Sequence, residues 1–147
     1  MGFAGLFFDA DKYIRRVESP RVKKTLGRKE QVVMYIQKYF EDYSPDYLDD
    51  VYNSCIRYID ESFAGQNATD NEVTSPEVQA VTTIIMWLES YIKQGSLDKL
   101  KYMRVLAAKE AFKLYCGMIS KVMELGIIDR RTAKSRITRF YRECGLG

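Results

Sequence analysis

The apolar positions of this chain recur mainly at intervals of three and four residues, which is the spacing of amphipathic α-helices. The clearest case is the stretch 45–63, where an apolar side faces a side of acids and polar residues. Its apolar positions are Leu48, Val51, Tyr52, Cys55, Ile59 and Phe63. We therefore predict a helix over 45–63 with one face buried.

The same spacing predicts further helices over residues 9–17, 28–43, 76–94, 97–125 and 130–143. The stretch 97–125 has the widest apolar stripe, so we expect it to lie centrally, and Gly117 within it marks either a bend or the close approach of another helix. The stretch 76–94 contains VTTIIMWL, whose β-branched residues would also suit a strand. Because no second convincing strand is present to pair with it, we predict a helix.

Residues that begin and end helices stand at the expected boundaries. Ser44 and Ser75 each precede a proline, and Asp129 precedes the last helix. Gly65, Gly95 and Gly126 each follow a periodic segment. The pattern predicts one all-α domain over 1–147: a helical bundle of four principal helices with short additional helices at the N- and C-termini. Residues 1–28 form an apolar and basic N-terminal arm in this prediction, and residues 65–75 form a mobile polar loop.

Composition indicates a globular protein in a reducing compartment. The chain is 46% hydrophobic and 29% charged. Its three cysteines are far apart and form no Cys-x-x-Cys pair, so we expect neither a disulfide framework nor a structural zinc site. The apolar N-terminus, MGFAGLFF, is too short for a membrane span. We therefore expect a cytoplasmic protein with no membrane association.

The sequence offers little for catalysis. It contains no histidine, which removes the usual general base and most zinc sites, and it has no glycine-rich phosphate loop. The acids of 45–63 fall on the polar side of their helix, away from the core where metal-binding bundles direct carboxylates. We predict no enzyme, no cofactor and no metal, and a carboxylate-based enzyme is a distant alternative.

Charge is unevenly distributed although the net charge is only +3. Residues 12–29 hold eight bases and one acid, whereas residues 41–77 hold ten acids and one base. The last predicted helix adds six bases. The chain is thus basic at both ends and acidic in its middle third.

This distribution leads to our principal functional hypothesis, in which the protein binds nucleic acid or a nucleoprotein complex through its basic ends. The candidate contacts are Arg21, Lys23, Lys24, Arg28, Lys29, Arg131, Lys134, Arg139 and Arg142. On the last helix, Ala133, Ile137, Phe140 and Cys144 form the expected buried stripe, opposite Arg131, Ser135, Thr138, Arg139 and Arg142. Together with residues 118–129, this helix has the outline of a helix–turn–helix unit.

Two alternatives remain open at this stage. The arginines of the last helix could simply solvate it, or pair with the acidic helix of the same molecule. Alternatively, the acidic helix could bind a protein, as an inhibitor or adaptor that occludes a nucleic-acid-processing enzyme. The candidate contacts for that role are Asp46, Tyr47, Asp49, Asp50, Asp60 and Glu61.

Overall fold

The computed structural model describes residues 8–20, 26–62, 75–93 and 106–146, and this part of the chain is helical without any β-strand. The elements are the 3-10 helix η1 (Ala10–Tyr13) and the α-helices α2 (Arg28–Tyr39), α3 (Pro45–Ser62), α4 (Pro76–Lys93), α6 (Ala108–Glu124) and α7 (Arg130–Glu143). The predicted all-α bundle is confirmed. The VTTIIMWL segment is helical, as its apolar spacing indicated.

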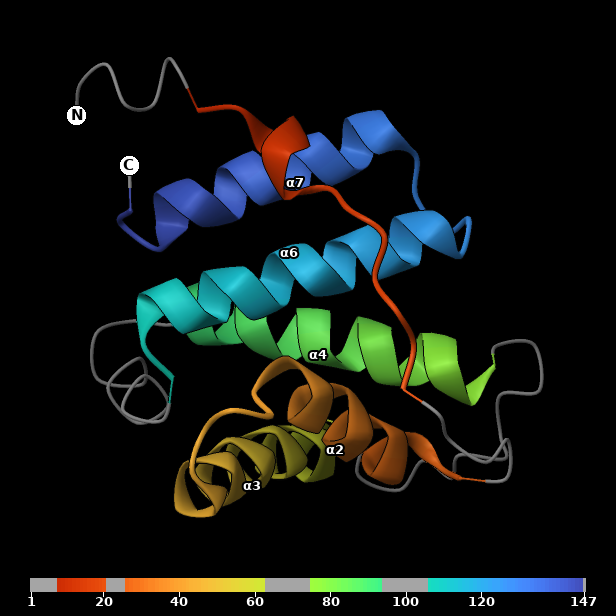
Figure 1. The fold of residues 1–147 in the computed structure, drawn as a ribbon, viewed down its shortest axis with the longest axis vertical. Helices are drawn as coiled ribbons and strands as arrows, with labels where there is room; N and C mark the ends of the chain where they lie inside the picture. The colour runs from red at the N-terminus through yellow and green to blue at the C-terminus, as the bar shows by residue number, and fades with distance from the viewer. Residues whose placement is uncertain (1–7, 21–25, 63–74, 94–105, 147) are drawn as a thin grey trace.

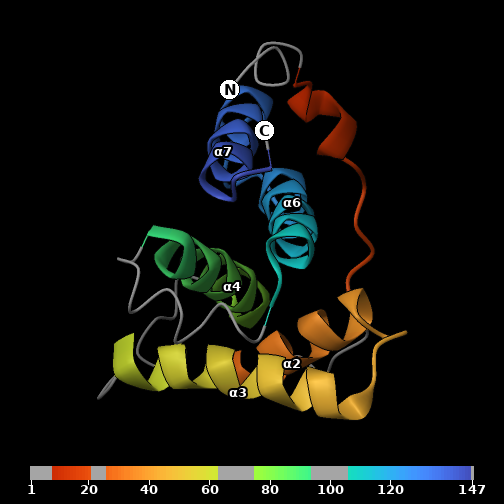
Figure 2. The ribbon, with the colours of Figure 1, turned by 90° about the vertical axis from the view of Figure 1, so that its left-hand side faces the viewer.

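The helices are stacked along the longest axis of the molecule (Figure 1). Helix α7 and η1 lie at one end, α6 and α4 lie in the middle, and α2 and α3 lie at the other end. Figure 2 shows α3 crossing beneath α4, on the side of α4 that is remote from α7. Helix α6 packs against α4, α7 and η1, and its residues from Leu114 to Val122 are all buried. The predicted central position of this helix is therefore correct.

Gly117 marks neither a bend nor the packing of a second helix backbone, but the close approach of one side chain from α2. Helix α6 continues through it without interruption, and Tyr39 from the end of α2 lies against the glycine. A β-carbon built on Gly117 would overlap the ring and hydroxyl of Tyr39. The absence of a side chain thus leaves room for the Tyr39 ring of α2 against α6.

The predicted helix boundaries are partly confirmed. The Ser44 hydroxyl accepts a hydrogen bond from the Tyr47 N–H at 3.3 Å, and the Ser75 hydroxyl accepts one from the Val78 N–H at 3.2 Å. Gly126 has a φ of 80°, the left-handed conformation expected of a residue that closes a helix. Gly65, Gly95, residues 65–74 of the predicted loop and residues 1–7 of the arm lie outside the described residues.

Three predicted helices are shorter in the structure. The helix predicted over 9–17 is reduced to η1, because the chain becomes extended at Ile14 and crosses α6. Helix α2 ends at Tyr39, because the fully buried Phe40 leaves the helical conformation and starts the turn into α3. The helix predicted over 97–125 is wrong at residues 106–107, since Ala107 is extended and α6 begins at Ala108; residues 97–105 lie outside the described residues.

Residues 14–20 form an extended segment, here called the strap, that joins the two ends of the molecule. It runs from η1 across α6 toward α2 (Figure 1). The Arg15 N–H donates a hydrogen bond to the Ser120 hydroxyl at 3.3 Å, and Val17 is buried. Near the end of the strap, the Tyr35 hydroxyl donates to Glu77 at 2.6 Å and lies 3.4 Å from the Ser19 hydroxyl.

Buried tyrosines make the fold sensitive to alkali. Burial raises the pKa of Tyr35 and Tyr115 above the ordinary value of 10, and that of Tyr47 to about 12. In the unfolded chain these phenols ionise near pH 10, so the folded state retains protons that the unfolded state has lost. The contribution of these tyrosines to the free energy of unfolding is therefore fully present below about pH 10. It is lost as the pH rises from there through the folded pKa values.

We expect urea unfolding at about pH 8 and about pH 11 to show this loss. In Tyr115→Phe, the decline should be shallower by up to about 1.4 kcal/mol per pH unit, the contribution of one proton. An identical slope in the variant and the wild type would contradict the assignment to Tyr115.

Candidate nucleic-acid interface

Helix α7 begins where the sequence predicts, at a fixed cap. The Asp129 carboxylate accepts a hydrogen bond from the Thr132 N–H at 2.8 Å. That hydrogen bond holds the pKa of Asp129 below its usual range, so the capping group is ionised at neutral pH. With Gly126 closing α6 three residues earlier, the turn between the two helices is set by local chemistry.

An apolar stripe attaches α7 to the rest of the bundle. Ala133, Ile137 and Phe140 are buried, as predicted, and the fourth predicted position, Cys144, is half-buried. The Phe140 ring stacks on Tyr115 of α6 with ring centroids 3.9 Å apart. The two helices lie side by side and run in opposite directions (Figures 1 and 2). This is an αα-hairpin, whereas the helices of a DNA-reading helix–turn–helix unit cross steeply.

Ion pairs fix the flanks of α7. On one flank, Asp11 of η1 pairs with Arg130 at 3.0 Å and Lys134 at 3.1 Å, and these cations, Lys134 foremost, lower the pKa of Asp11. On the other flank, Arg136 pairs with Glu89 of α4 at 2.8 Å. Lys134 is therefore partly engaged within the molecule.

Glu89 has a second partner, because the Tyr115 hydroxyl of α6 donates a hydrogen bond to the same carboxylate oxygen at 2.6 Å. This three-residue network joins α4, α6 and α7 at one point. Arg136 is thus a structural residue rather than part of an exposed basic surface.

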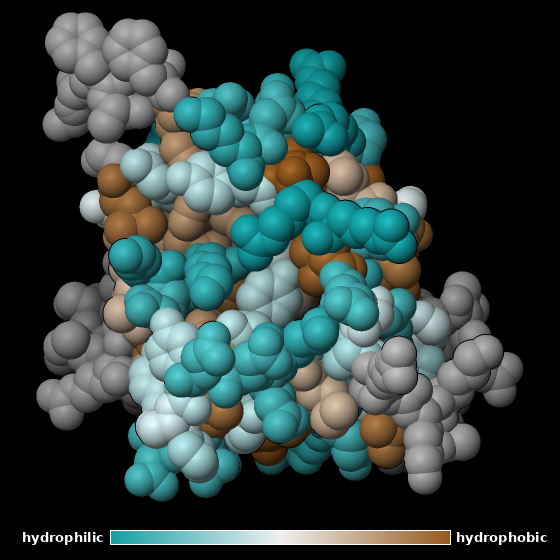
Figure 3. Space-filling view, in the orientation of Figure 1, coloured by the Kyte–Doolittle hydropathy of each residue, from teal (hydrophilic) through white to brown (hydrophobic). Residues whose placement is uncertain are grey.

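The outward face of α7 consists of Arg131, Ser135, Arg139 and Arg142, all of which are exposed, whereas Thr138, also predicted on this face, is half-buried. Arg139 pairs with Glu143 one turn further on, at 3.0 Å. In the described part of the chain, neither Arg131 nor Arg142 forms an ion pair with a carboxylate. They are eleven residues apart, which corresponds to about 16 Å along the helix axis. Figure 3 shows a largely hydrophilic surface at the end of the molecule formed by α7.

The other predicted basic contacts do not lie beside α7. Lys29, at the start of α2, pairs with Asp60 of α3, and Arg28 is half-buried next to it. Both are at the α2–α3 end of the molecule. Arg21, Lys23 and Lys24 lie outside the described residues. Within the described chain, the basic surface of α7 and the start of α2 are thus separate.

The acidic helix α3 lies at the end of the molecule opposite α7, so the ion pairs of α7 are made with Asp11, Glu89 and Glu143 instead. The exposed acids of α3 among the predicted contacts are Asp46, Asp49, Asp50, Asp60 and Glu61. Tyr47 is half-buried and stacks on Tyr43 with centroids 5.1 Å apart. The structure therefore presents a basic and an acidic face at opposite ends.

Arg16 and Lys121 were not among the predicted contacts. Lys121 is buried in α6, and the helical count indicates this, since the residue lies three positions after Met118 and next to Val122 on the apolar side. Arg16 stands on the strap close to Lys121. No local pattern brings two residues together from positions so far apart in the chain.

Comparison with protein-family models, with curated proteins and with solved structures finds no match. Among the described residues, no helix is long and apolar enough to cross a membrane. The same residues contain no group of three or more cysteine and carboxylate side chains arranged to hold a metal ion. All three cysteines, Cys55, Cys116 and Cys144, are free thiols, and burial raises the pKa of Cys116 to about 12.

Proposed function

We propose that this protein is a non-catalytic nucleic-acid-binding protein whose contact surface is the outward face of α7. The observation that carries the proposal is the pair of exposed arginines, Arg131 and Arg142, at the two ends of one helical face. Within the described chain neither forms an ion pair, although Arg131 interacts electrostatically with the neighbouring Asp129, and the acidic helix is at the far end of the molecule. Such cations are available to neutralise phosphates.

The spacing of the two arginines favours contacts to the nucleic-acid backbone. A major groove of B-form DNA is about 12 Å wide, so side chains about 16 Å apart along a helix reach phosphates on both sides of it. Ser135 lies between them on the same face and is exposed. Phosphate contacts position a protein without reading sequence. We therefore infer binding that depends strongly on salt and weakly on base sequence.

The free thiols fit the same proposal. Three cysteines without a disulfide suit a reducing compartment, where nucleic acid is also found. We place the protein in the cytoplasm on this basis.

Removing both arginines should weaken binding substantially. In Arg131→Ala/Arg142→Ala, we expect the dissociation constant for an oligonucleotide to rise at least tenfold at about 50 mM salt, and the slope of log affinity against log salt to fall by roughly two. Both side chains are exposed, so the unfolding temperature should remain unchanged. Fluorescence anisotropy and thermal unfolding measure the two quantities.

The matched control is Lys38→Ala/Arg57→Ala, which removes the same charge from α2 and α3. It should alter binding far less than the α7 pair. An equal loss in both pairs would mean that net charge alone drives binding, and the assignment to α7 would fail.

The acidic face of α3 supports a second candidate, binding of a basic protein segment. Asp46, Asp49 and Asp50 are exposed on one side of the helix, beside the Tyr43–Tyr47 stack. If this is the function, an arginine-rich peptide will bind the wild type and not Asp49→Asn/Asp50→Asn, while the α7 variants bind it normally. The reverse pattern with an oligonucleotide supports the α7 proposal.

A further inference from the structure

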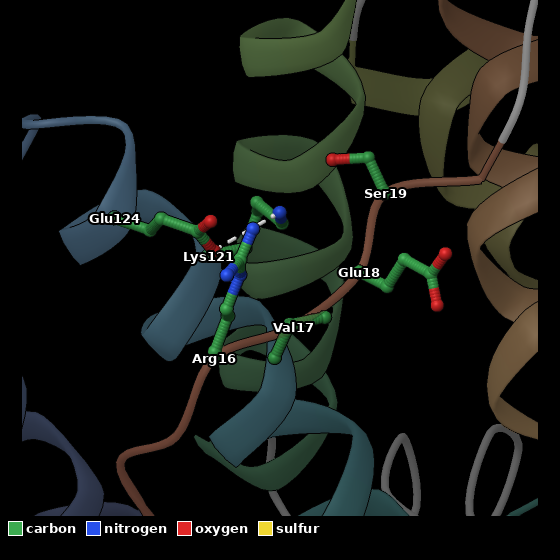
Figure 4. Close-up of a pocket in the computed structure, with 6 residues that line it drawn as sticks. All are labelled: Arg16, Val17, Glu18, Ser19, Lys121 and Glu124. Atoms are coloured by element: carbon green, nitrogen blue, oxygen red, sulfur yellow. Dashed lines mark ion pairs between the residues drawn. The ribbon is translucent and has the colours of Figure 1, made fainter.

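A pocket of about 460 Å³ lies between the strap and the second half of α6. It is lined by Arg16, Val17, Glu18, Ser19, Lys121 and Glu124. Figure 4 shows these side chains and the ion pair between Lys121 and Glu124. The pocket combines a buried cation with an exposed one, which is uncommon on a solvated surface.

Lys121 is the buried cation, with 3% of its surface exposed. Its ammonium group pairs with the Glu124 carboxylate at 3.1 Å. An ammonium group has three hydrogens to donate, and a buried charge is stabilised only when it is well paired. Lys121 lines the pocket, so a ligand there would reach a charge that is largely removed from water.

Arg16 supplies a second cation at the same carboxylate. Its guanidinium lies beside the Lys121–Glu124 pair in Figure 4, whereas the Glu18 side chain is directed away from it. Glu18 instead approaches Lys38 of α2, at 3.9 Å. Among the described residues Arg16 forms no ion pair of its own. Two cations thus share the Glu124 carboxylate, while Glu18, the other carboxylate of the lining, is paired with Lys38.

The Glu124 carboxylate already places a negative charge beside Lys121 and Arg16. The Lys121 ammonium, together with the Val17 N–H and Arg16, holds the pKa of Glu124 below its usual range, so the carboxylate is charged at neutral pH. About two fifths of its side chain is exposed, at 38%. A stronger anion entering from solvent could therefore take its place beside Lys121 and Arg16.

The pocket continues toward α7. A second hollow of about 360 Å³ is lined by Ile14, Arg15, Arg16, Ser120, Met123, Glu124 and Arg130. Arg130 is the first residue of α7, and Arg16 and Glu124 belong to both hollows. Cations thus continue from the start of α7 to Lys121.

We propose that this pocket binds a phosphate group of the nucleic acid held by α7, and that Glu124 is a counter-ion which the phosphate displaces from Lys121 and Arg16. A phosphate oxygen accepts charge-assisted hydrogen bonds from both cations, and the guanidinium of Arg16 suits its geometry. The Ser19 hydroxyl, which also lines the pocket, supplies a further donor. The inference rests on the proposed function for the source of the phosphate.

The decisive variant is Glu124→Gln, because the proposed phosphate site predicts that this variant binds nucleic acid more tightly than the wild type. Glutamine removes the competing charge yet keeps an oxygen that accepts from the Val17 N–H. We expect affinity for an oligonucleotide to increase roughly three- to tenfold, the effect of removing one opposing charge, and Arg16→Ala to decrease it by a similar factor. Arg16 is exposed, so the second variant should fold normally.

Inorganic phosphate is the independent probe. Titration should shift the NMR signals of the Arg16 and Lys121 side chains in the wild type, more strongly in Glu124→Gln and weakly in Arg16→Ala. If Glu124→Gln lowers affinity, or phosphate moves no signal at Lys121, the pocket is not a phosphate site; oligonucleotide binding through α7 would then stand on its own. If phosphate binds there but no oligonucleotide binds the wild type, the proposed function is overturned together with the nucleic-acid source.

Discussion

Replacing Gly117 with alanine is expected to lower the free energy of unfolding by about 2 kcal/mol, the remainder of an overpacking cost of about 3 kcal/mol. The new methyl group would overlap the aromatic ring and hydroxyl of Tyr39, so the Tyr39 side chain would have to shift. The better helix propensity of alanine, about 1 kcal/mol, offsets only part of this cost. For a chain of 147 residues, the unfolding temperature should fall by roughly 6 °C.

Two further variants test whether the overlap with Tyr39 causes the loss of stability. Lys113→Ala, at an exposed position of the same helix, should change stability by less than about 0.5 kcal/mol. Adding Tyr39→Ala to Gly117→Ala should cost less than the sum of the two single changes, because the overlap is removed. Stability equal to the wild type in Gly117→Ala would contradict the close packing of Tyr39 on Gly117.

The second large effect is expected at the network that holds α7. In Arg136→Met, Glu89 keeps its hydrogen bond from Tyr115 but loses its cation, so a partly buried carboxylate is left without a counter-charge. Breaking a fully buried pair costs about 3–5 kcal/mol, and the partial exposure of this pair reduces the expected loss to about 2 kcal/mol. Chemical denaturation measures the loss.

The matched variant is Glu89→Gln/Arg136→Met, in which no unpaired charge remains and the glutamine oxygen still accepts from Tyr115. It should be more stable than Arg136→Met alone. If the double variant is the less stable of the two, the network does not stabilise the protein through the charge of Arg136.

Local sequence features account for much of the fold. Helices α3, α4 and α7 follow from clear three- and four-residue spacing and from caps at Ser44, Ser75 and Asp129, which act within one turn. The C-terminal end of α2 and the start of α6 could not be predicted this way. At Phe40 and Ala107 the apolar spacing continues, although the chain there is no longer in the helical conformation.

The candidate site, too, could be predicted from the sequence only in part. The outward arginines of α7 follow from the position of its apolar stripe, and that stripe is confirmed at Ala133, Ile137 and Phe140. The position of Arg16 and Lys121 depends instead on the strap, which crosses α6 and brings Arg16 to Lys121. Because these two residues are far apart in the chain, their contact produces no periodic pattern in the sequence. The distribution of charge along the chain pointed to residues 21–29 instead.

The most direct test of nucleic-acid binding by α7 is the salt dependence of wild-type binding to a short duplex. With Arg131, Arg139 and Arg142 each neutralising a phosphate, the dissociation constant should rise roughly 40-fold between about 50 and about 200 mM salt. Fluorescence anisotropy gives this value at each concentration. An absence of binding at about 50 mM salt, or an affinity that does not change with salt, would contradict the account.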